Sequence, residues 1–114
     1  YSRGDNFRSK TKIWFLMEVI WSVRAKITFF NVLDYLEKNW TKKEILQFYQ
    51  KTQLVLNAIK GNPGIFPVSS KHKEIRKAFV DKNNSLFYQV DSYNQKIYLL
   101  TFFDNRQNPD RLKL

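Results

Sequence analysis

The sequence predicts an α+β domain in which an antiparallel two-helix hairpin packs on a small, antiparallel-rich β-sheet, in the order β-α-α-β-β-β. Three observations lead to this class. A helical period of 3.6 residues runs through residues 22–60. After a loop rich in proline, glycine and serine, the period changes to strand-like alternation. A chain of 114 residues that is 43% hydrophobic also has the size and apolar content of one domain with a packed core.

The N-terminal segment differs in composition from the rest of the chain. Residues 1–12 are polar and basic, and residues 13–21 are then almost wholly apolar. This apolar run is too short to span a bilayer, and charge follows it where a signal peptide would have a small-residue cleavage site. We therefore expect residues 1–16 to be an extension outside the fold. Met17 would be the natural start, and residues 17–114 would form the domain.

The first strand and the first helix should follow directly. Residues 18–21 alternate in the manner of a strand, which we expect at the edge of the sheet or next to it, and Ser22 leads into a helix. The apolar positions of this helix are Ala25, Phe29, Val32 and Leu36, with Val23, Ile27, Phe30 and Leu33 beside them. Its polar face would hold Arg24, Thr28, Asn31 and Lys38.

A second helix is indicated by its start and stop signals. Thr41 and Glu44 have the spacing of a capping box. The apolar period continues to Lys60, where Gly61 ends the helix. Because only Asn39 and its neighbours join the two helices, they should form an antiparallel hairpin. The expected apolar stripe is Ile45, Phe48, Val55 and Ile59, flanked by Leu46, Tyr49 and Leu56.

Three strand-like runs end the chain, at residues 74–80, 86–90 and 96–103. Short polar turns separate them, which is typical of an antiparallel meander. The last run is apolar on both faces and should therefore be a central strand. Strict alternation would place Ile97, Leu99, Thr101 and Phe103 on one face, and Tyr98, Leu100 and Phe102 on the other.

Several local motifs, in this order and spacing, resemble the RelE/ParE family of bacterial toxins from about Met17 to the C terminus. They are Val-Ile-Trp-Ser at 19–22 before a helix, Asn-Pro-Gly at 62–64, Ile-Arg-Lys at 75–77, Phe-Tyr-Gln-Val at 87–90, and Asp-Asn-Arg-Gln-Asn-Pro at 104–109. The resemblance implies the toxin of a type II toxin-antitoxin system, held in check by a cognate antitoxin protein. A net charge of +10 suits an acidic partner, whether nucleic acid, a membrane surface or an acidic protein segment.

The family contains two mechanisms, and the resemblance implies one or the other. RelE-like members are ribosome-dependent mRNA endoribonucleases that use a cluster of Lys and Arg, whereas ParE-like members inhibit DNA gyrase and need no catalytic group. Arg106 matches the arginine that follows the last strand in the nucleases. However, Leu112 stands where a nuclease tyrosine would be expected, and the place of a second arginine falls near Val80 or Asp81. We therefore favour gyrase inhibition and leave open whether the chain is an enzyme; a non-toxic basic nucleic-acid-binding domain is a further alternative.

Candidate site residues follow from charge and position. Arg106 is the candidate catalytic residue if the chain is a nuclease, and a salt bridge with Asp104 or Asp110 is its structural alternative. Some of the other basic residues are expected to be ordinary solvated side chains. The candidates for binding nucleic acid or the target are Lys71, Lys73, Arg76, Lys77, Lys82, Arg106 and Arg111.

Other chemistry finds little support in the sequence. The chain has no cysteine, which excludes disulfides and thiolate metal sites and favours the cytoplasm. His72 is the single histidine and lies between two lysines, which is more typical of a solvated loop residue than of a general base. We expect no metal, no cofactor, no membrane partner and no small-molecule substrate. Tyr88, Tyr98, Phe102 and Phe103 could stack on bases, but aromatics in strands are more often core.

Overall fold

The structure is a computed structural model, and it describes residues 17–114. The expected extension, residues 1–16, lies outside the described residues. The described elements follow the predicted order β-α-α-β-β-β. They are β1 (Glu18–Trp21), α2 (Val23–Asn39), α3 (Lys42–Gly61), β2 (Arg76–Phe79), β3 (Asn84–Asp91), β4 (Lys96–Asp104) and a short 3-10 helix, η1 (Pro109–Arg111).

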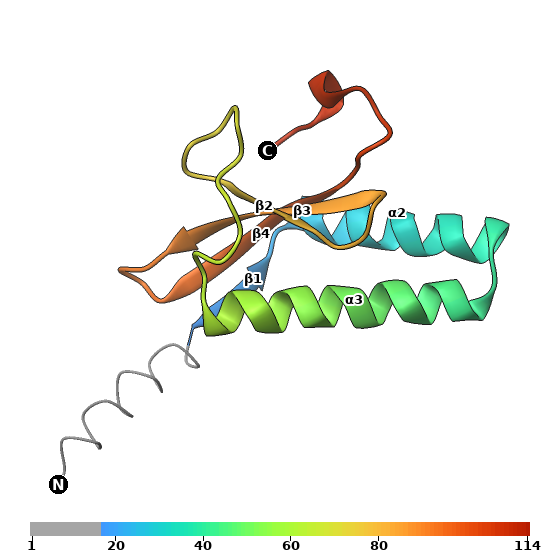
Figure 1. Ribbon diagram of the computed structural model, residues 1–114, viewed down its shortest axis with the longest axis horizontal. Helices are drawn as coiled ribbons and strands as arrows, with labels where there is room; N and C mark the ends of the chain where they lie inside the picture. Colours follow the sequence, from blue (N-terminus) through green and yellow to red (C-terminus); the bar gives the residue numbers. More distant parts are fainter. Residues whose placement is uncertain (1–16) are drawn as a thin grey trace, which may run out of the picture.

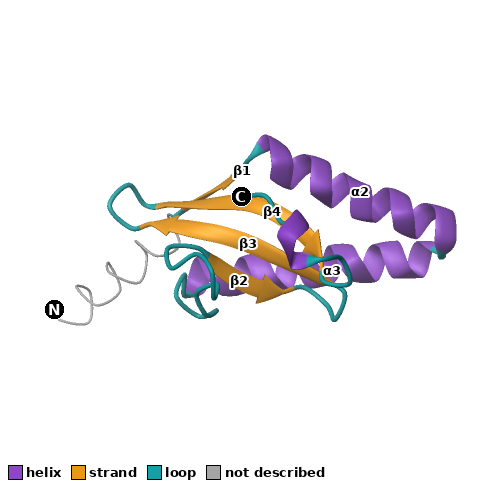
Figure 2. Ribbon diagram, turned by 90° about the horizontal axis from the view of Figure 1, so that it is seen from above, coloured by secondary structure: helices purple, strands orange, loops and turns teal. Residues whose placement is uncertain are grey.

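The four strands form one sheet in the order β1-β4-β3-β2 (Figure 1). β1 lies at the edge and pairs in parallel with β4, while β2, β3 and β4 form the predicted antiparallel meander. β4 is therefore central, as its two apolar faces indicated. The helical hairpin covers one face of the sheet, and its tip projects past the end of the strands (Figure 2). Neither helix in residues 17–114 has the length and apolarity needed to cross a membrane.

The start of each helix is held by a side chain that the sequence places there. The Ser22 hydroxyl accepts a hydrogen bond from the Ala25 amide and donates one to the Leu100 carbonyl, both over 2.9 Å, which ties the start of α2 to β4. At the start of α3, Thr41 and Glu44 form the predicted capping box. These caps set the point at which each helix begins over the sheet.

Aromatic side chains hold the hairpin against the β1–β4 half of the sheet. The Phe29 ring centroid lies 5.2 Å from that of Phe102 and 5.6 Å from that of Phe48. Trp21 stacks on Phe102 at 5.7 Å. Such pairs add to the free energy gained by burying their area. The apolar core residues with no exposed surface are Ala25, Ile59, Ala78, Leu86, Tyr88, Ile97 and Leu99.

The pairing of β3 with β4 contains a shift that the sequence did not reveal. Phe87 pairs with Thr101, whereas Tyr88 pairs with Leu99. Leu100 is therefore left without a partner, and an extra residue of this kind reverses the alternation beyond it. As a result Phe102, and not the predicted Phe103, joins Leu99 in the core.

The outer face of α2 also differs from expectation. Val23, Ile27 and Phe30, predicted beside the core stripe, have exposed fractions of 73%, 55% and 59%. At 100° per residue they lie on the side of the helix opposite Ala25 and Phe29. On α3 the residues Leu46 and Tyr49 are likewise more than a third exposed, and Thr52 fills a core position instead.

Thr28, predicted on the polar face of α2, turns toward the sheet. Its Oγ1 accepts a hydrogen bond from the Phe102 amide over 2.9 Å and donates one to the Arg24 carbonyl over 2.7 Å. Because β1 ends at Trp21, the edge of β4 beyond that point has no neighbouring strand. Thr28 supplies the acceptor that a strand would otherwise provide.

Candidate functional site

Arg106 borders a cavity of about 670 Å³ between the tip of the helical hairpin and the end of the sheet. This volume is in the range of ligand-binding pockets. The walls come from α2, α3, the β2–β3 turn, and the end of β4 with the loop that follows it. Among the predicted site residues, Lys82 and Arg106 meet here. The polar and charged residues most relevant to chemistry in this cavity are Tyr35, Lys51, Asp81, Lys82, Asp104 and Arg106.

The Arg106 guanidinium is held by Asp104 through two parallel hydrogen bonds. Nε donates to Oδ1 over 2.9 Å and Nη2 donates to Oδ2 over 2.8 Å. The Arg106 backbone amide also donates to Oδ1, over 2.9 Å. The hydrogen bonds from Arg106 hold the pKa of Asp104 below its usual range, and the carboxylate raises the pKa of Arg106. The salt bridge foreseen as the structural alternative for Arg106 is confirmed.

Tyr35 of α2 completes the surroundings of this guanidinium. The Arg106 Cζ atom lies 5.8 Å from the centroid of the Tyr35 ring, within the range of cation–π contacts. The Tyr35 side chain remains partly exposed and faces the cavity. Sequence reasoning did not single out Tyr35 or Lys51 as site residues, because nothing near either residue in the sequence indicates that the fold brings it to the cavity that Arg106 borders.

Asp81 is, with Val80, one of the two residues near which a second arginine was expected from the nuclease pattern. Its Oδ1 accepts hydrogen bonds from the amides of Asn83 and Asn84, each over 2.8 Å. This carboxylate therefore closes the β2–β3 turn, which is a structural task. Lys82 in the same turn, and Lys51 on α3, form no ion pair with another residue of the described part of the chain.

Arg76, predicted to bind nucleic acid or the target, is bonded to the loop that follows α3. Its Nη1 donates to the Phe66 carbonyl over 2.7 Å and to the Gly64 carbonyl over 3.4 Å. The neighbouring Tyr88 hydroxyl donates to the Pro63 carbonyl over 2.9 Å, and burial raises the pKa of Tyr88. Arg76 and Tyr88 pair across β2 and β3, so together they fasten this loop to the sheet.

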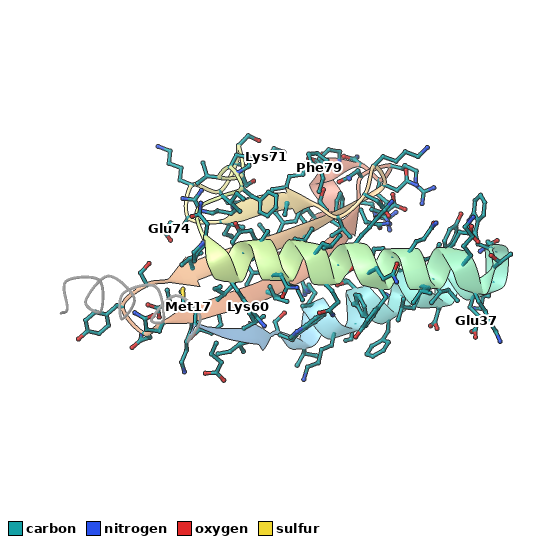
Figure 3. The ribbon with its side chains drawn as sticks, turned by 60° about the horizontal axis from the view of Figure 1, so that its bottom comes forward. Met17, Glu37, Lys60, Lys71, Glu74 and Phe79 are labelled. Carbon is teal, nitrogen blue, oxygen red and sulfur yellow. The ribbon has the colours of Figure 1, made fainter. Side chains whose placement is uncertain are left out.

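The remaining predicted residues do not share one surface. Lys77 points to the opposite face from Arg76, and its Nζ lies 4.9 Å from the centroid of the exposed Phe79 ring. Lys71 forms an exposed ion pair with Asp110 at 3.8 Å. Lys71 and Phe79 lie on the side of the molecule away from α3 (Figure 3). Lys73 borders a second cavity, beside Arg76, and Arg111 borders a third, beside the start of α2.

Of the other residues considered for chemistry, only the buried Phe102 lines the Arg106 cavity. His72 is not among the residues that line it. No group of three or more His, Cys, Asp or Glu within residues 17–114 is placed to hold a metal ion. Two of the aromatic residues considered for base stacking, Tyr88 and Phe102, are buried in the core.

Comparison with known proteins gives matches at the level of structure. A scan against protein-family models gave no match, and a search of curated proteins also gave none. The chain superposes on the chromosomal ParDE toxin-antitoxin system from P. aeruginosa with a TM-score of 0.66 and 13% identity, covering 79% of this chain and 97% of that one.

Two further solved structures agree with this match. For the YoeB/ParE toxin from Agrobacterium tumefaciens the TM-score is 0.57 at 11% identity, with 78% of this chain and 99% of that one covered. For the YoeB dimer from Staphylococcus aureus it is 0.51 at 20% identity, with 75% and 92% covered. The three matches each cover between 75% and 79% of this chain. This chain therefore has the fold of the RelE/ParE-like toxins, as the motifs of its sequence indicated.

Proposed function

We propose that this chain is the toxin of a type II toxin-antitoxin system, that it acts by inhibiting DNA gyrase, and that a cognate antitoxin neutralises it. The fold supports a toxin, because it is shared with a ParDE toxin-antitoxin system, with a YoeB/ParE toxin and with a mutant toxin from Helicobacter pylori. The net charge of +10 supports an acidic protein partner. The proposed targets are cytoplasmic, and the proposal therefore places the chain in the bacterial cytoplasm.

We favour gyrase inhibition because the Arg106 guanidinium is already hydrogen-bonded to Asp104. A nuclease arginine has to meet the scissile phosphate, whereas here two guanidinium donors are bonded to Asp104. Asp81 lies near the position where a second arginine would be expected, and its carboxylate accepts hydrogen bonds from the backbone amides of its own turn. Leu112 stands in place of the expected tyrosine. Inhibition of gyrase through a protein–protein contact requires no catalytic group, so these departures leave that mechanism intact.

One observation favours the alternative, ribosome-dependent mRNA cleavage. Tyr35, Lys51, Lys82 and Arg106 border one cavity, and Lys and Arg are the groups that stabilise a phosphorane-like transition state. An incoming phosphate would have to compete with Asp104 for Arg106. If this reading is right, Arg106→Ala should lower the cleavage rate by roughly 10²–10³-fold while the fold stays intact.

The mechanisms are separated by two assays on the same purified protein. We expect inhibition of DNA supercoiling by gyrase, and intact ribosome-bound mRNA. In cells, induced expression should arrest growth, with DNA breaks appearing before mRNA loss. Cleavage of ribosome-bound mRNA without gyrase inhibition would replace the first mechanism by the second. Harmless expression together with nucleic-acid binding would instead identify a basic binding domain without toxicity.

The antitoxin is expected to be a small acidic protein encoded beside this chain, with a segment that folds as it binds. Such a segment would place a helix on the exposed part of the helical hairpin and add chain along the sheet edge. Co-expression should then raise the soluble yield and restore growth. A protein that is soluble, monomeric and harmless when expressed alone would remove the main support for this partner. No cofactor and no small-molecule substrate enters this proposal.

A further inference from the structure

The cavity that Arg106 borders has a buried apolar wall and an exposed aromatic rim. Phe48 and Phe102 form the buried wall and are 2% and 4% exposed. Tyr35 near the end of α2 and Trp40 in the link between the helices border the cavity from the hairpin tip, and they are 46% and 58% exposed. Aromatic rings beside an apolar wall offer a flat ligand a surface on which to stack. The gyrase mechanism proposed above assigns no ligand to this cavity.

The carboxylates at this cavity all accept hydrogen bonds from the fold itself. Glu44 accepts from the Thr41 amide over 3.0 Å as part of the capping box. Asp81 accepts from the backbone amides of its own turn. Asp104 accepts from the guanidinium of Arg106. Each negative charge at the cavity is therefore already compensated by donors of the protein.

The cations at the cavity are not compensated in the same way. Lys51 on α3 and Lys82 in the β2–β3 turn both border it, and neither forms an ion pair within residues 17–114. Arg106 uses Nε and Nη2 for Asp104, and its Nη1 atom has no hydrogen-bond partner in the same part of the chain. Three elements of the fold thus bring uncommitted cationic donors to one cavity, which favours a ligand with an anionic group.

Neutral polar side chains complete the lining. The carboxamides of Asn31, Gln47 and Gln107 border the same cavity, on α2, on α3 and in the loop after β4. A carboxamide offers both donors and an acceptor, and it pairs well with the edge of a nucleobase, adenine above all. Aromatic stacking, carboxamides and cations are together the contacts that a nucleotide needs.

We propose that the Arg106 cavity is a binding site for a free adenine nucleotide. The phosphate, with about two negative charges at neutral pH, is held by Lys51, Lys82 and Arg106. The base stacks against Tyr35 and Trp40, and the carboxamides contact its edge. The cavity volume of about 670 Å³ is in the range of small-molecule sites. The nucleotide is bound and not converted, so this site needs no catalytic group and is independent of the toxin function proposed above.

Other ligands use the cavity less completely. Inorganic phosphate would leave the aromatic rim empty, and a neutral nucleoside would leave the three cations without a partner. A strand of RNA or DNA would carry further phosphates past the carboxylates that border the cavity, where like charges repel. A single nucleotide satisfies the rim and the cations without this repulsion.

Binding has a structural consequence that can be measured. Tyr35, Trp40 and Lys51 belong to the hairpin, whereas Lys82 and Arg106 belong to the end of the sheet. The hairpin tip projects past the strands (Figure 2). A ligand held from both sides fastens the tip to the sheet, and a ligand that binds only the folded state raises Tm with its concentration.

The test measures the binding of AMP, adenosine and inorganic phosphate to the whole chain by isothermal titration calorimetry, with thermal melting alongside. We expect AMP to bind and to raise Tm. Adenosine and phosphate should each bind about tenfold more weakly or less, because each lacks one half of the contacts. Tyr35→Leu should weaken AMP by roughly tenfold, the loss of one stacking contact, and leave the affinity for phosphate unchanged.

Lys51→Gln and Lys60→Gln form a matched pair on α3. Lys51→Gln removes a cation from the cavity and should weaken AMP by roughly tenfold. Lys60 does not border the cavity and lies at the end of α3 far from Glu37 of the hairpin tip (Figure 3). The same loss of charge at Lys60 should leave the affinity for AMP within about twofold of the parent. Circular dichroism checks that each variant keeps the fold.

Equal affinity of the parent and Lys51→Gln for AMP would overturn the proposal, as would the absence of AMP binding. Adenosine or phosphate that binds as tightly as AMP would reduce the site to an aromatic pocket or to an anion site, and would overturn it as well. A short single-stranded oligonucleotide that binds more tightly than AMP, and is lost in Lys51→Gln, would assign the cavity to a nucleic-acid strand instead. The gyrase and growth assays do not bear on this result, since nucleotide binding is measured without gyrase or ribosomes.

Discussion

Replacing Asp104 by Asn tests the most specific contact in the Arg106 cavity. The asparagine keeps the shape of the side chain and one oxygen that can accept from the Arg106 amide. It removes the negative charge and the second acceptor, so the two parallel hydrogen bonds of 2.9 and 2.8 Å to the guanidinium cannot both persist. The variant therefore loses the charge-assisted hydrogen bonds from the guanidinium but can keep the hydrogen bond from the Arg106 backbone amide.

The expected magnitude follows from exposure and geometry. The side chains of Asp104 and Arg106 are 28% and 54% exposed, so solvent screens the pair substantially. Surface ion pairs contribute about 0.2–1 kcal/mol, and bidentate geometry favours the upper end of that range. We expect Asp104→Asn to lower the free energy of unfolding by about 1 kcal/mol at neutral pH. In a domain of this size that corresponds to a fall in Tm of about 4–8 °C.

The pH dependence of this difference has a definite sign. Arg106 holds the pKa of Asp104 lower in the folded protein than in the unfolded chain. The stabilisation is therefore fully present above the unfolded pKa of about 4, and it is lost as the pH falls through the lower folded value. Asp104→Asn lacks this contribution at every pH. The gap in stability between the parent and the variant should consequently close in acid.

Urea unfolding at neutral pH and at about pH 2.5, below the usual carboxylate range, measures both quantities. Asp110→Asn is the control, because its 3.8 Å contact with Lys71 is exposed on both sides and should contribute less than about 0.5 kcal/mol. Equal stability of the parent and Asp104→Asn at neutral pH would refute the argument. A gap that stays constant down to acid pH would show that the loss has another cause.

Three further predictions test the fold around the site. Arg76→Met should lower the free energy of unfolding by about 1–2 kcal/mol, since it removes the charged donor to two loop carbonyls, whereas Lys77→Met should change it by less than about 0.5 kcal/mol in the same denaturant titration. Thr28→Val should cost about 1–2 kcal/mol and raise hydrogen exchange at the Phe102 amide, which loses its acceptor; unchanged exchange would contradict the role assigned to Thr28. Deleting residues 1–16 should leave thermal stability and toxicity nearly unchanged, and a loss above about 1 kcal/mol in the free energy of unfolding would show that residues 13–16 pack into the domain.

Features set by neighbours in the sequence were predictable. Ser22 begins α2 and the Thr41–Glu44 capping box begins α3, because a cap needs a side chain only two or three residues from the amide it binds. The alternation of residues 96–99 likewise predicted the core positions at the start of β4. The predicted alternation along β4 fails at Leu100. The register shift there depends on how β4 pairs with β3, and no residue type in β4 itself specifies it.

For the basic residues, too, the sequence predicted one property and the tertiary structure decided another. Seven of them were predicted to bind nucleic acid or the target, and the structure distributes them among separate surfaces. Arg76 and Lys77 are adjacent in sequence, yet strand alternation turns them to opposite faces. Arg76 then meets loop carbonyls while Lys77 lies over the Phe79 ring. A run of basic residues predicts local charge, but the strand decides which way each charge points.

The sequence by itself determined the order of elements, the limits of the hairpin and the net positive charge, since each depends on composition or on residues a few positions apart. Tertiary structure decided which side chains surround Arg106. Tyr35 and Lys51 come from α2 and α3, and they border the same cavity as Arg106 only because the hairpin docks on the sheet. It also left Val23, Ile27 and Phe30 uncovered, because one helix can turn only one side to the core and the sheet selected the side of Ala25 and Phe29.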